Sequence, residues 1–164
     1  MLEELFVGIV SAAEGQYGLC VCIDPRGRDA GFTRFSWSPK GLATVLGRVR
    51  HEAAEVVVGV EPGQWDHEMA LVLAGSPVIA RMPHPDAIDS LVARVRHKRN
   101  ALRARATSIA LLLLVTDYPL KPVRPEQLAV PRAKAHASDW MRACQQRLVT
   151  GLERSPCPVG NRAG

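Results

Sequence analysis

The segment EVVVGVE at residues 55–61 limits the fold more than any other part of the chain. Its apolar residues follow one another without the polar alternation of a half-exposed strand, which predicts a strand buried on both faces. Such strands lie in the centre of a sheet covered by helices, usually parallel to a neighbour. The segment ends on a carboxylate, Glu61, and Pro62 and Gly63 come next. An acid at this place is either an ordinary surface residue or part of a functional site.

The segments around this strand predict a mixed α/β sheet. Three short apolar or alternating segments come first, and the turn sequences between them favour an antiparallel meander. Ser38 is the expected N-cap of the helix that follows. The expected elements are strands at 5–10, 18–25, 30–37, 55–61 and 78–82, and helices over 38–51, about 64–73, about 85–95 and about 100–115. Three strands followed by alternating helix and strand indicate one sheet with helices on its faces.

Length and proline content predict the domain boundaries. A chain of 164 residues, 47% of them hydrophobic, can bury one sizeable core, which we assign to residues 1–115. A proline-rich connector at 116–132 holds four of the twelve prolines. An amphipathic helix at 133–154 and a disordered tail at 155–164 are expected to follow. The apolar stripe along 133–152 predicts a homodimer through a coiled-coil-like contact.

Apolar runs and cysteines exclude several classes of protein. The longest apolar run, Ile109 to Val115, has seven residues, whereas a membrane span needs about 20. The start MLEELF lacks the basic residues of a signal peptide, so we expect a cytoplasmic protein with no membrane partner. The four cysteines do not have zinc-ligand spacing, and Cys20 and Cys22 are expected to be small buried residues of a strand. No metal or other cofactor is expected from this composition.

Positive charge is concentrated in two places. The net charge is +5, and residues 119–164 carry the whole excess. A second concentration lies inside the neutral part, within twelve residues that contain no acid. This basic cluster consists of Arg94, Arg96, Lys98, Arg99, Arg103 and Arg105. Such a cluster indicates either contacts to nucleic-acid phosphates or a solvated helix face, and charge alone does not separate the two.

Three sequence blocks, taken in order, resemble one known family. They are GIVSAA at the end of the first strand, VEPGQWDHEMALVLAGSPVIARMPHP at 60–85, and KRNALRAR at 98–105. The chain resembles the N-terminal domain of the DEDD transposases, insertion-sequence recombinases whose nuclease domain is RuvC-like. The resemblance implies an RNase H-like mixed five-stranded sheet with helices on its faces, plus a C-terminal helical segment. It covers roughly residues 5–152.

The resemblance also implies the place of a catalytic site. Nucleases of this kind bind two divalent cations, usually Mg²⁺, through carboxylates at strand ends and on a neighbouring helix. The corresponding positions here are Val10, Glu61, Asn100 and Arg103, of which Glu61 alone is a carboxylate. Glu61 is therefore the expected catalytic and metal position, and one carboxylate does not hold two ions. We expect a nucleic-acid-binding domain of the DNA transposition lineage that has lost cleavage, with DNA or structured RNA as its partner.

Two alternatives stay open at this point. The first is a divalent-metal nuclease with relocated ligands, which would need Mg²⁺ as a cofactor. Candidate replacement ligands are Glu14, Asp24, Asp66 and His67. The second is the truncated, non-functional remnant of a transposase. The missing carboxylates favour a binding domain over a nuclease.

Overall fold

The computed structural model describes residues 1–63, 65–95, 100–115 and 121–128. Contacts within the chain divide it into two units, Met1–Val130 and Pro131–Gly164, and every described residue belongs to the first. The predicted C-terminal helix at 133–154 and tail at 155–164 lie outside the described residues.

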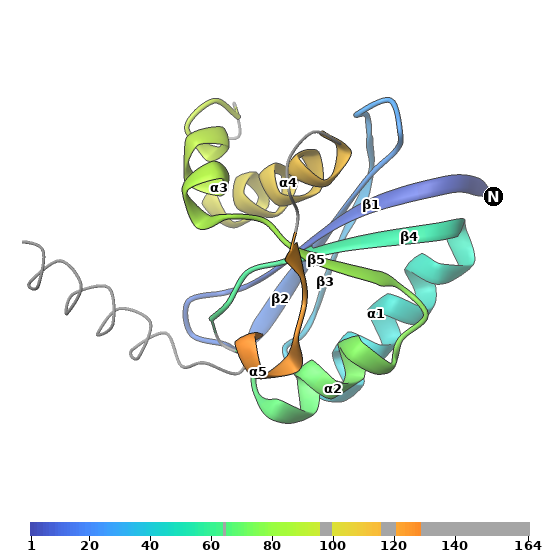
Figure 1. Ribbon diagram of the computed structural model, residues 1–164, viewed down its shortest axis with the longest axis vertical. Helices are drawn as coiled ribbons and strands as arrows, with labels where there is room; N and C mark the ends of the chain where they lie inside the picture. The colour runs from blue at the N-terminus through green and yellow to red at the C-terminus, as the bar shows by residue number, and fades with distance from the viewer. Residues whose placement is uncertain (64, 96–99, 116–120, 129–164) are drawn as a thin grey trace, which may run out of the picture. The chain divides into compact units, whose positions relative to one another are not determined.

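The described part is built around one mixed sheet, as predicted. Its strands are β1 (Leu2–Ser11), β2 (Tyr17–Ile23), β3 (Asp29–Ser36), β4 (Ala53–Val60), β5 (Ile79–Met82) and the two-residue β6 (Lys121–Pro122). Their order is β3-β2-β1-β4-β5-β6 (Figure 1). The meander β1-β2-β3 is antiparallel, and β4 and β5 are parallel to β1 and β4 respectively. This is the RNase H-like arrangement that the sequence predicted.

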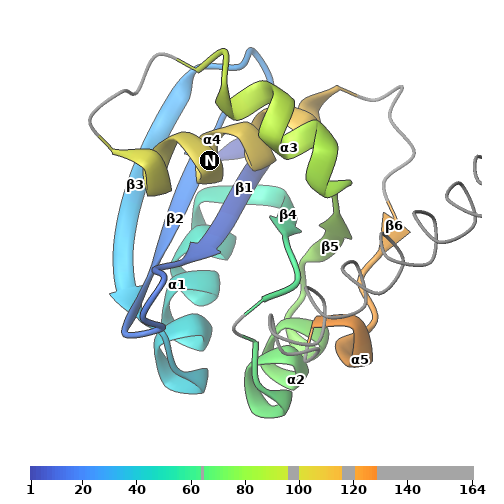
Figure 2. The same cartoon turned by 90° about the vertical axis from the view of Figure 1, so that its left-hand side faces the viewer.

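Helices cover both faces of the sheet. They are α1 (Pro39–Glu52), α2 (His67–Gly75), α3 (Pro85–Val92), α4 (Ala101–Leu114) and the short α5 (Pro125–Leu128). Helices α1 and α2 lie on one face, and α3 and α4 lie on the other (Figure 2). Ser38 caps α1, as predicted, because its side chain accepts a hydrogen bond from the Gly41 N–H. No helix of the described residues is long and apolar enough to cross a membrane.

The burial of each strand follows its place in the sheet. Strands β1, β2 and β4 are central. Strand β2 is buried almost throughout, and β1 and β4 are buried beyond their first few residues, which explains their unbroken apolar runs. Alternate residues of β1 enter different cores: Ile9 packs with α1 and α2, whereas Val10 packs with α3 and α4. Strand β3 lies at the edge and is mostly exposed, including Phe32 at 53%.

The predicted connector at 116–132 contributes to the fold where the structure describes it. Its residues Lys121–Pro122 form β6, which pairs antiparallel with β5. Helix α5 follows, and its Leu128 is fully buried in the same core as α1 and α2. Prolines therefore interrupt this segment without removing it from the domain.

Helix α4 lies unusually close to the centre of the sheet. Gly8 of β1 and Gly59 of β4 are register partners beneath it. A Cβ atom at Gly8 would overlap the backbone carbonyl of Ala106, and one at Gly59 would lie 2.5 Å from Cγ2 of Ile109. Gly8 thus permits direct contact between the helix backbone and β1, and Gly59 leaves room for the Ile109 side chain on β4.

This close approach predicts the effect of two glycine substitutions. Gly8→Ala should destabilise the domain by about 1–3 kcal/mol or more, because a backbone carbonyl has little freedom to move away. Gly47→Ala is the matched control, since Gly47 is exposed within α1 and a Cβ there meets nothing within 4 Å. That change should stabilise the domain by about 0.5–1 kcal/mol. Urea unfolding of both variants tests this, and an unchanged midpoint for Gly8→Ala would contradict the close packing.

Candidate functional site

The strand register brings two of the implied site positions together. Ile9 of β1 lies opposite Val60 of the parallel strand β4. Val10 and Glu61 are the next residues along, so they meet at the carboxyl ends of two central strands. Val10 is 2% exposed and belongs to the core beneath α3 and α4. An apolar side chain thus occupies the position next to Glu61.

Glu61 is held by an arginine of α4. Arg105 donates from Nε to Oε1 and from Nη2 to Oε2 of Glu61, each at 2.6 Å. Its remaining terminal nitrogen, Nη1, donates to Asp89 of α3 at 2.9 Å. The Glu61 side chain is 14% exposed, and its backbone carbonyl accepts from Nε1 of Trp65 at 3.1 Å. One guanidinium therefore connects the end of β4 with both helices on that face.

The electrostatics of this group favour a fixed positive charge. The pKa of Arg105 is raised above its ordinary value, first by the hydrogen bond to Glu61 and then by Asp89, against an opposing effect of burial. Paired hydrogen bonds between a guanidinium and a carboxylate are strong and directional. Because both Glu61 oxygens accept from Arg105, a cation that approached their remaining lone pairs would meet the positive charge of that guanidinium.

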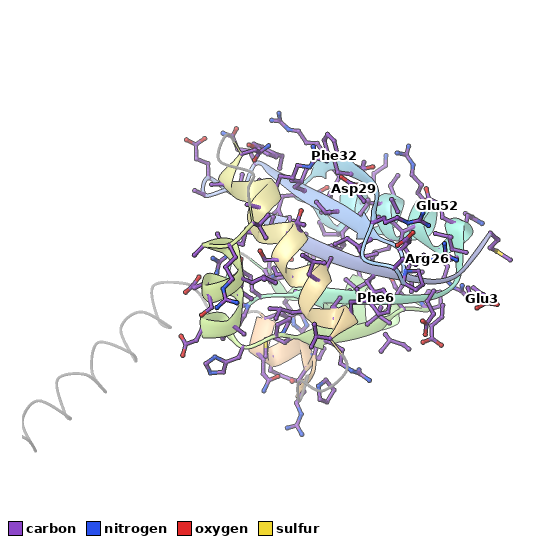
Figure 3. All side chains as sticks on the ribbon, turned by 90° about the horizontal axis from the view of Figure 1, so that it is seen from above. Glu3, Phe6, Arg26, Asp29, Phe32 and Glu52 are labelled. Atoms are coloured by element: carbon purple, nitrogen blue, oxygen red, sulfur yellow. The ribbon has the colours of Figure 1, made fainter. Side chains whose placement is uncertain are left out.

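Asn100 and Arg103 have other structural roles. The Asn100 side chain caps α4 by accepting from the Arg103 N–H at 3.0 Å. Nη2 of Arg103 donates to Asp29 of β3 at 2.7 Å, and its guanidinium carbon lies 4.1 Å from the centroid of the Phe32 ring. Asp29 and Phe32 belong to the edge strand β3 (Figure 3). The expectation that Arg103 stands beside Glu61 is thus corrected, because Arg105 takes that place.

The candidate replacement ligands do not gather around Glu61. Asp24 closes the turn before β3, where Oδ1 accepts from the Arg26 and Arg28 N–H groups. Asp66 caps α2 by accepting from the Met69 N–H, His67 is the first residue of α2, and Glu14 is exposed in the β1–β2 turn. In the described ranges, no three His, Cys, Asp or Glu side chains are grouped so that they could hold a metal ion.

The predicted basic cluster is divided between paired and exposed residues. Arg103 and Arg105 are neutralised by Asp29, Glu61 and Asp89. Arg94 is exposed after α3. The other three members, Arg96, Lys98 and Arg99, lie outside the described residues. Two of the six residues of the basic cluster, Arg103 and Arg105, therefore form ion pairs within the domain.

Sequence reasoning missed Asp29 and Asp89 as partners of the two arginines. Asp29 is 74 residues from Arg103, and Asp89 is 16 residues from Arg105. A usable signal was present on α4, since Arg105 lies four residues before Ile109 and so shares the face that packs on the sheet. A basic residue on that face calls for an acidic partner.

A scan of the sequence against protein-family models finds no match, and a search of curated proteins finds none.

The two ion pairs of α4 should differ in strength. In a double-mutant cycle, Glu61→Gln with Arg105→Met should give a coupling energy of about 1–3 kcal/mol, because the pair is bidentate and mostly buried. Asp29→Asn with Arg103→Met is the matched comparison on the same helix. Its Asp29 side chain is 51% exposed, so its coupling should stay below about 1 kcal/mol. Equal coupling energies from chemical unfolding would contradict this view of the site.

Asp24 should contribute stability that depends on pH. Hydrogen bonds from the Arg28 backbone, and then from its side chain and from Arg26, lower the pKa of Asp24 against an opposing effect of burial. Folding thus favours the charged form of Asp24. The resulting stabilisation is fully present above the pKa of Asp24 in the unfolded chain, and it is lost as pH falls through the pKa of Asp24 in the folded chain. Asp24→Asn should therefore lower Tm at pH 7, and the difference from wild type should shrink below about pH 4. A difference that stays constant down to pH 2 would show that ionisation of Asp24 is not involved.

Proposed function

We propose that this chain is a nucleic-acid-binding domain of the DEDD transposase lineage that does not cleave its substrate. The observation that carries the proposal is the contact between Glu61 and Arg105 at the carboxyl end of β4. The RNase H-like strand order puts this acid beside the end of β1, where the resemblance expects a metal ligand. The Arg105 guanidinium balances its charge.

The ligand set supports the absence of cleavage. Two-metal catalysis needs several oxygen ligands held with defined geometry around both ions. Val10 supplies none, and the Asn100 side-chain oxygen is engaged in capping α4. Arg105 adds positive charge where a metal site needs negative charge, whereas Arg103 pairs with Asp29 of the edge strand. On this proposal the domain needs no Mg²⁺, and its partner is DNA or structured RNA.

Charge distribution supports a role in binding. The chain carries +5, and the excess lies in residues 119–164, most of which are outside the described residues. Arg94 offers an exposed cation beside the segment that holds Arg96, Lys98 and Arg99. Clustered cations attract the phosphate backbone without sequence preference. We propose that this segment contacts nucleic acid, while Arg103 and Arg105 mainly stabilise the fold.

Two further parts of the proposal concern assembly and location. Dimerisation through residues 133–152 stays a prediction, because that helix is outside the described residues. We propose a cytoplasmic location, where thiols stay reduced. Cys20 and Cys22 are buried and free, as fits that environment.

A combined cleavage and binding assay tests this function. Single-stranded, duplex and branched DNA, and a structured RNA, should stay intact with the protein in Mg²⁺ or Mn²⁺. The same substrates should bind at low salt, with a log–log slope of roughly −0.9 per phosphate neutralised on duplex DNA.

Two outcomes would contradict the proposal. Metal-dependent cutting that disappears in Glu61→Ala would favour the nuclease with relocated ligands. The absence of binding to every substrate, from a protein that is folded by circular dichroism, would favour a remnant without a nucleic-acid partner.

A further inference from the structure

A groove lies between the edge strand β3 and helix α1, away from Glu61. Its volume is about 470 Å³, and residues of β3, of the Ser38 turn and of α1 line it. Helix α1 covers the face of the sheet opposite to α4 (Figure 2). The groove is thus separate from the ion pairs described above.

The groove carries a stripe of exposed polar residues along α1. Lys40, Thr44 and Arg48 follow one another at intervals of four residues, so they lie on one side of the helix. All three are exposed. No acidic residue lines the groove, and neither Lys40 nor Arg48 forms an ion pair with any described residue. These two cations differ in this respect from Arg103 and Arg105, which have acidic partners within the fold.

Hydroxyl groups add neutral hydrogen-bonding capacity to the same surface. Thr33 and Ser36 of β3 and Ser38 before α1 line the groove. The Ser38 oxygen accepts from Gly41 N–H when it caps α1, which leaves its own O–H free to donate outward. Arg34 also borders the groove, but its guanidinium carbon lies 3.6 Å from the centroid of the Tyr17 ring. The two α1 cations are therefore the better candidates for ligand binding.

The spacing of these cations indicates an extended anion. Lys40 and Arg48 are eight residues apart, which corresponds to about 12 Å along a helix axis. A single phosphate group is too small to contact both side chains at once without drawing them together. Along the axis of a duplex one strand rises about 3.4 Å per nucleotide, so a span of about 12 Å parallel to that axis corresponds to roughly three to four nucleotides. The groove fits a chain of phosphates better than a free phosphate ion.

We propose that the groove between β3 and α1 binds the phosphodiester backbone of nucleic acid, with Lys40 and Arg48 contacting separate phosphates. This inference rests on the proposed function and adds a binding surface on the face of the sheet opposite to Glu61. It concerns the backbone shared by DNA and RNA and carries no sequence preference.

Salt titrations of charge variants test the proposal. Affinity for a fluorescent DNA duplex and for an RNA hairpin is measured over a range of NaCl with wild type and with Lys40→Gln/Arg48→Gln. If each cation neutralises one phosphate, the double variant should flatten the log–log slope on duplex DNA by about two units. Its affinity near 0.1 M salt should fall by about tenfold or more. Arg26→Gln is the control, because Arg26 is exposed in the turn before β3 and does not line the groove (Figure 3).

Each outcome leads to a separate conclusion. If the double variant binds like Arg26→Gln, the groove does not bind the phosphodiester backbone and this inference is wrong. Binding by the wild type would still support the proposed function. A slope flattened instead by Arg94→Gln assigns the contact to the α3–α4 side and also overturns the groove. If wild type binds neither probe, the proposed function fails together with this inference.

An NMR titration supplies an independent readout on the folded chain of 164 residues. Addition of the DNA duplex should shift the amide signals of Thr33, Ser36 and Gly41, whereas inorganic phosphate at the same phosphate concentration should shift them much less. Equal shifts with inorganic phosphate would assign the groove to a single anion. Shifts that depend on protein concentration without any nucleic acid would assign the β3 edge to contact between copies of the chain. Either result would overturn the proposal.

Discussion

The close contact of α4 with the centre of the sheet determines the chemistry of this domain. Gly8 and Gly59 lie opposite each other on β1 and β4. Gly8 lets the backbone of α4 lie directly on β1, and Gly59 leaves room for the Ile109 and Leu113 side chains of α4. At that separation the Arg105 side chain reaches the end of β4 and binds Glu61 through two hydrogen bonds. A larger residue at either glycine would move the helix outward and lengthen these contacts. The glycine pair and the ion pair are therefore parts of one arrangement, which joins β1, β4, α3 and α4.

This arrangement explains why an acid follows the apolar run at the end of β4. A half-buried carboxylate without a partner is costly, and the cost disappears when a guanidinium supplies both charge and matching donors. Metal-dependent nucleases stabilise acids at this place with divalent cations. Here the balancing charge is part of the chain, so Glu61 serves as a link between elements. The exposed cations of α1 have no such acid within the described residues, so they are available for a partner outside the chain.

Local patterns predicted most of the fold, and long-range pairing limited the prediction of the site. Apolar runs located β1, β2 and β4, and Ser38 marked the start of α1, because burial and capping leave a signature in neighbouring residues. The partners of Arg103 and Arg105 are 74 and 44 residues away, and such contacts depend on how helices lie across the sheet. The resemblance to the transposase domain drew attention to Arg103, whereas the helical phase of α4 points Arg105 toward Glu61. Strand β6 was not predicted either. A two-residue edge strand has almost no sequence signature, and the prolines around it indicate a connector.

We expect Arg105, and not a divalent cation, to hold the carboxylate of Glu61. Paramagnetic broadening by Mn²⁺ in NMR spectra of the isotope-labelled protein measures this directly, because the effect reports proximity of the ion to individual amides. The amide signals of Val10, Glu61 and Arg105 should keep their intensity when small amounts of Mn²⁺ are added. Selective loss of these signals, abolished by Glu61→Gln, would show instead that a metal binds at the end of β4.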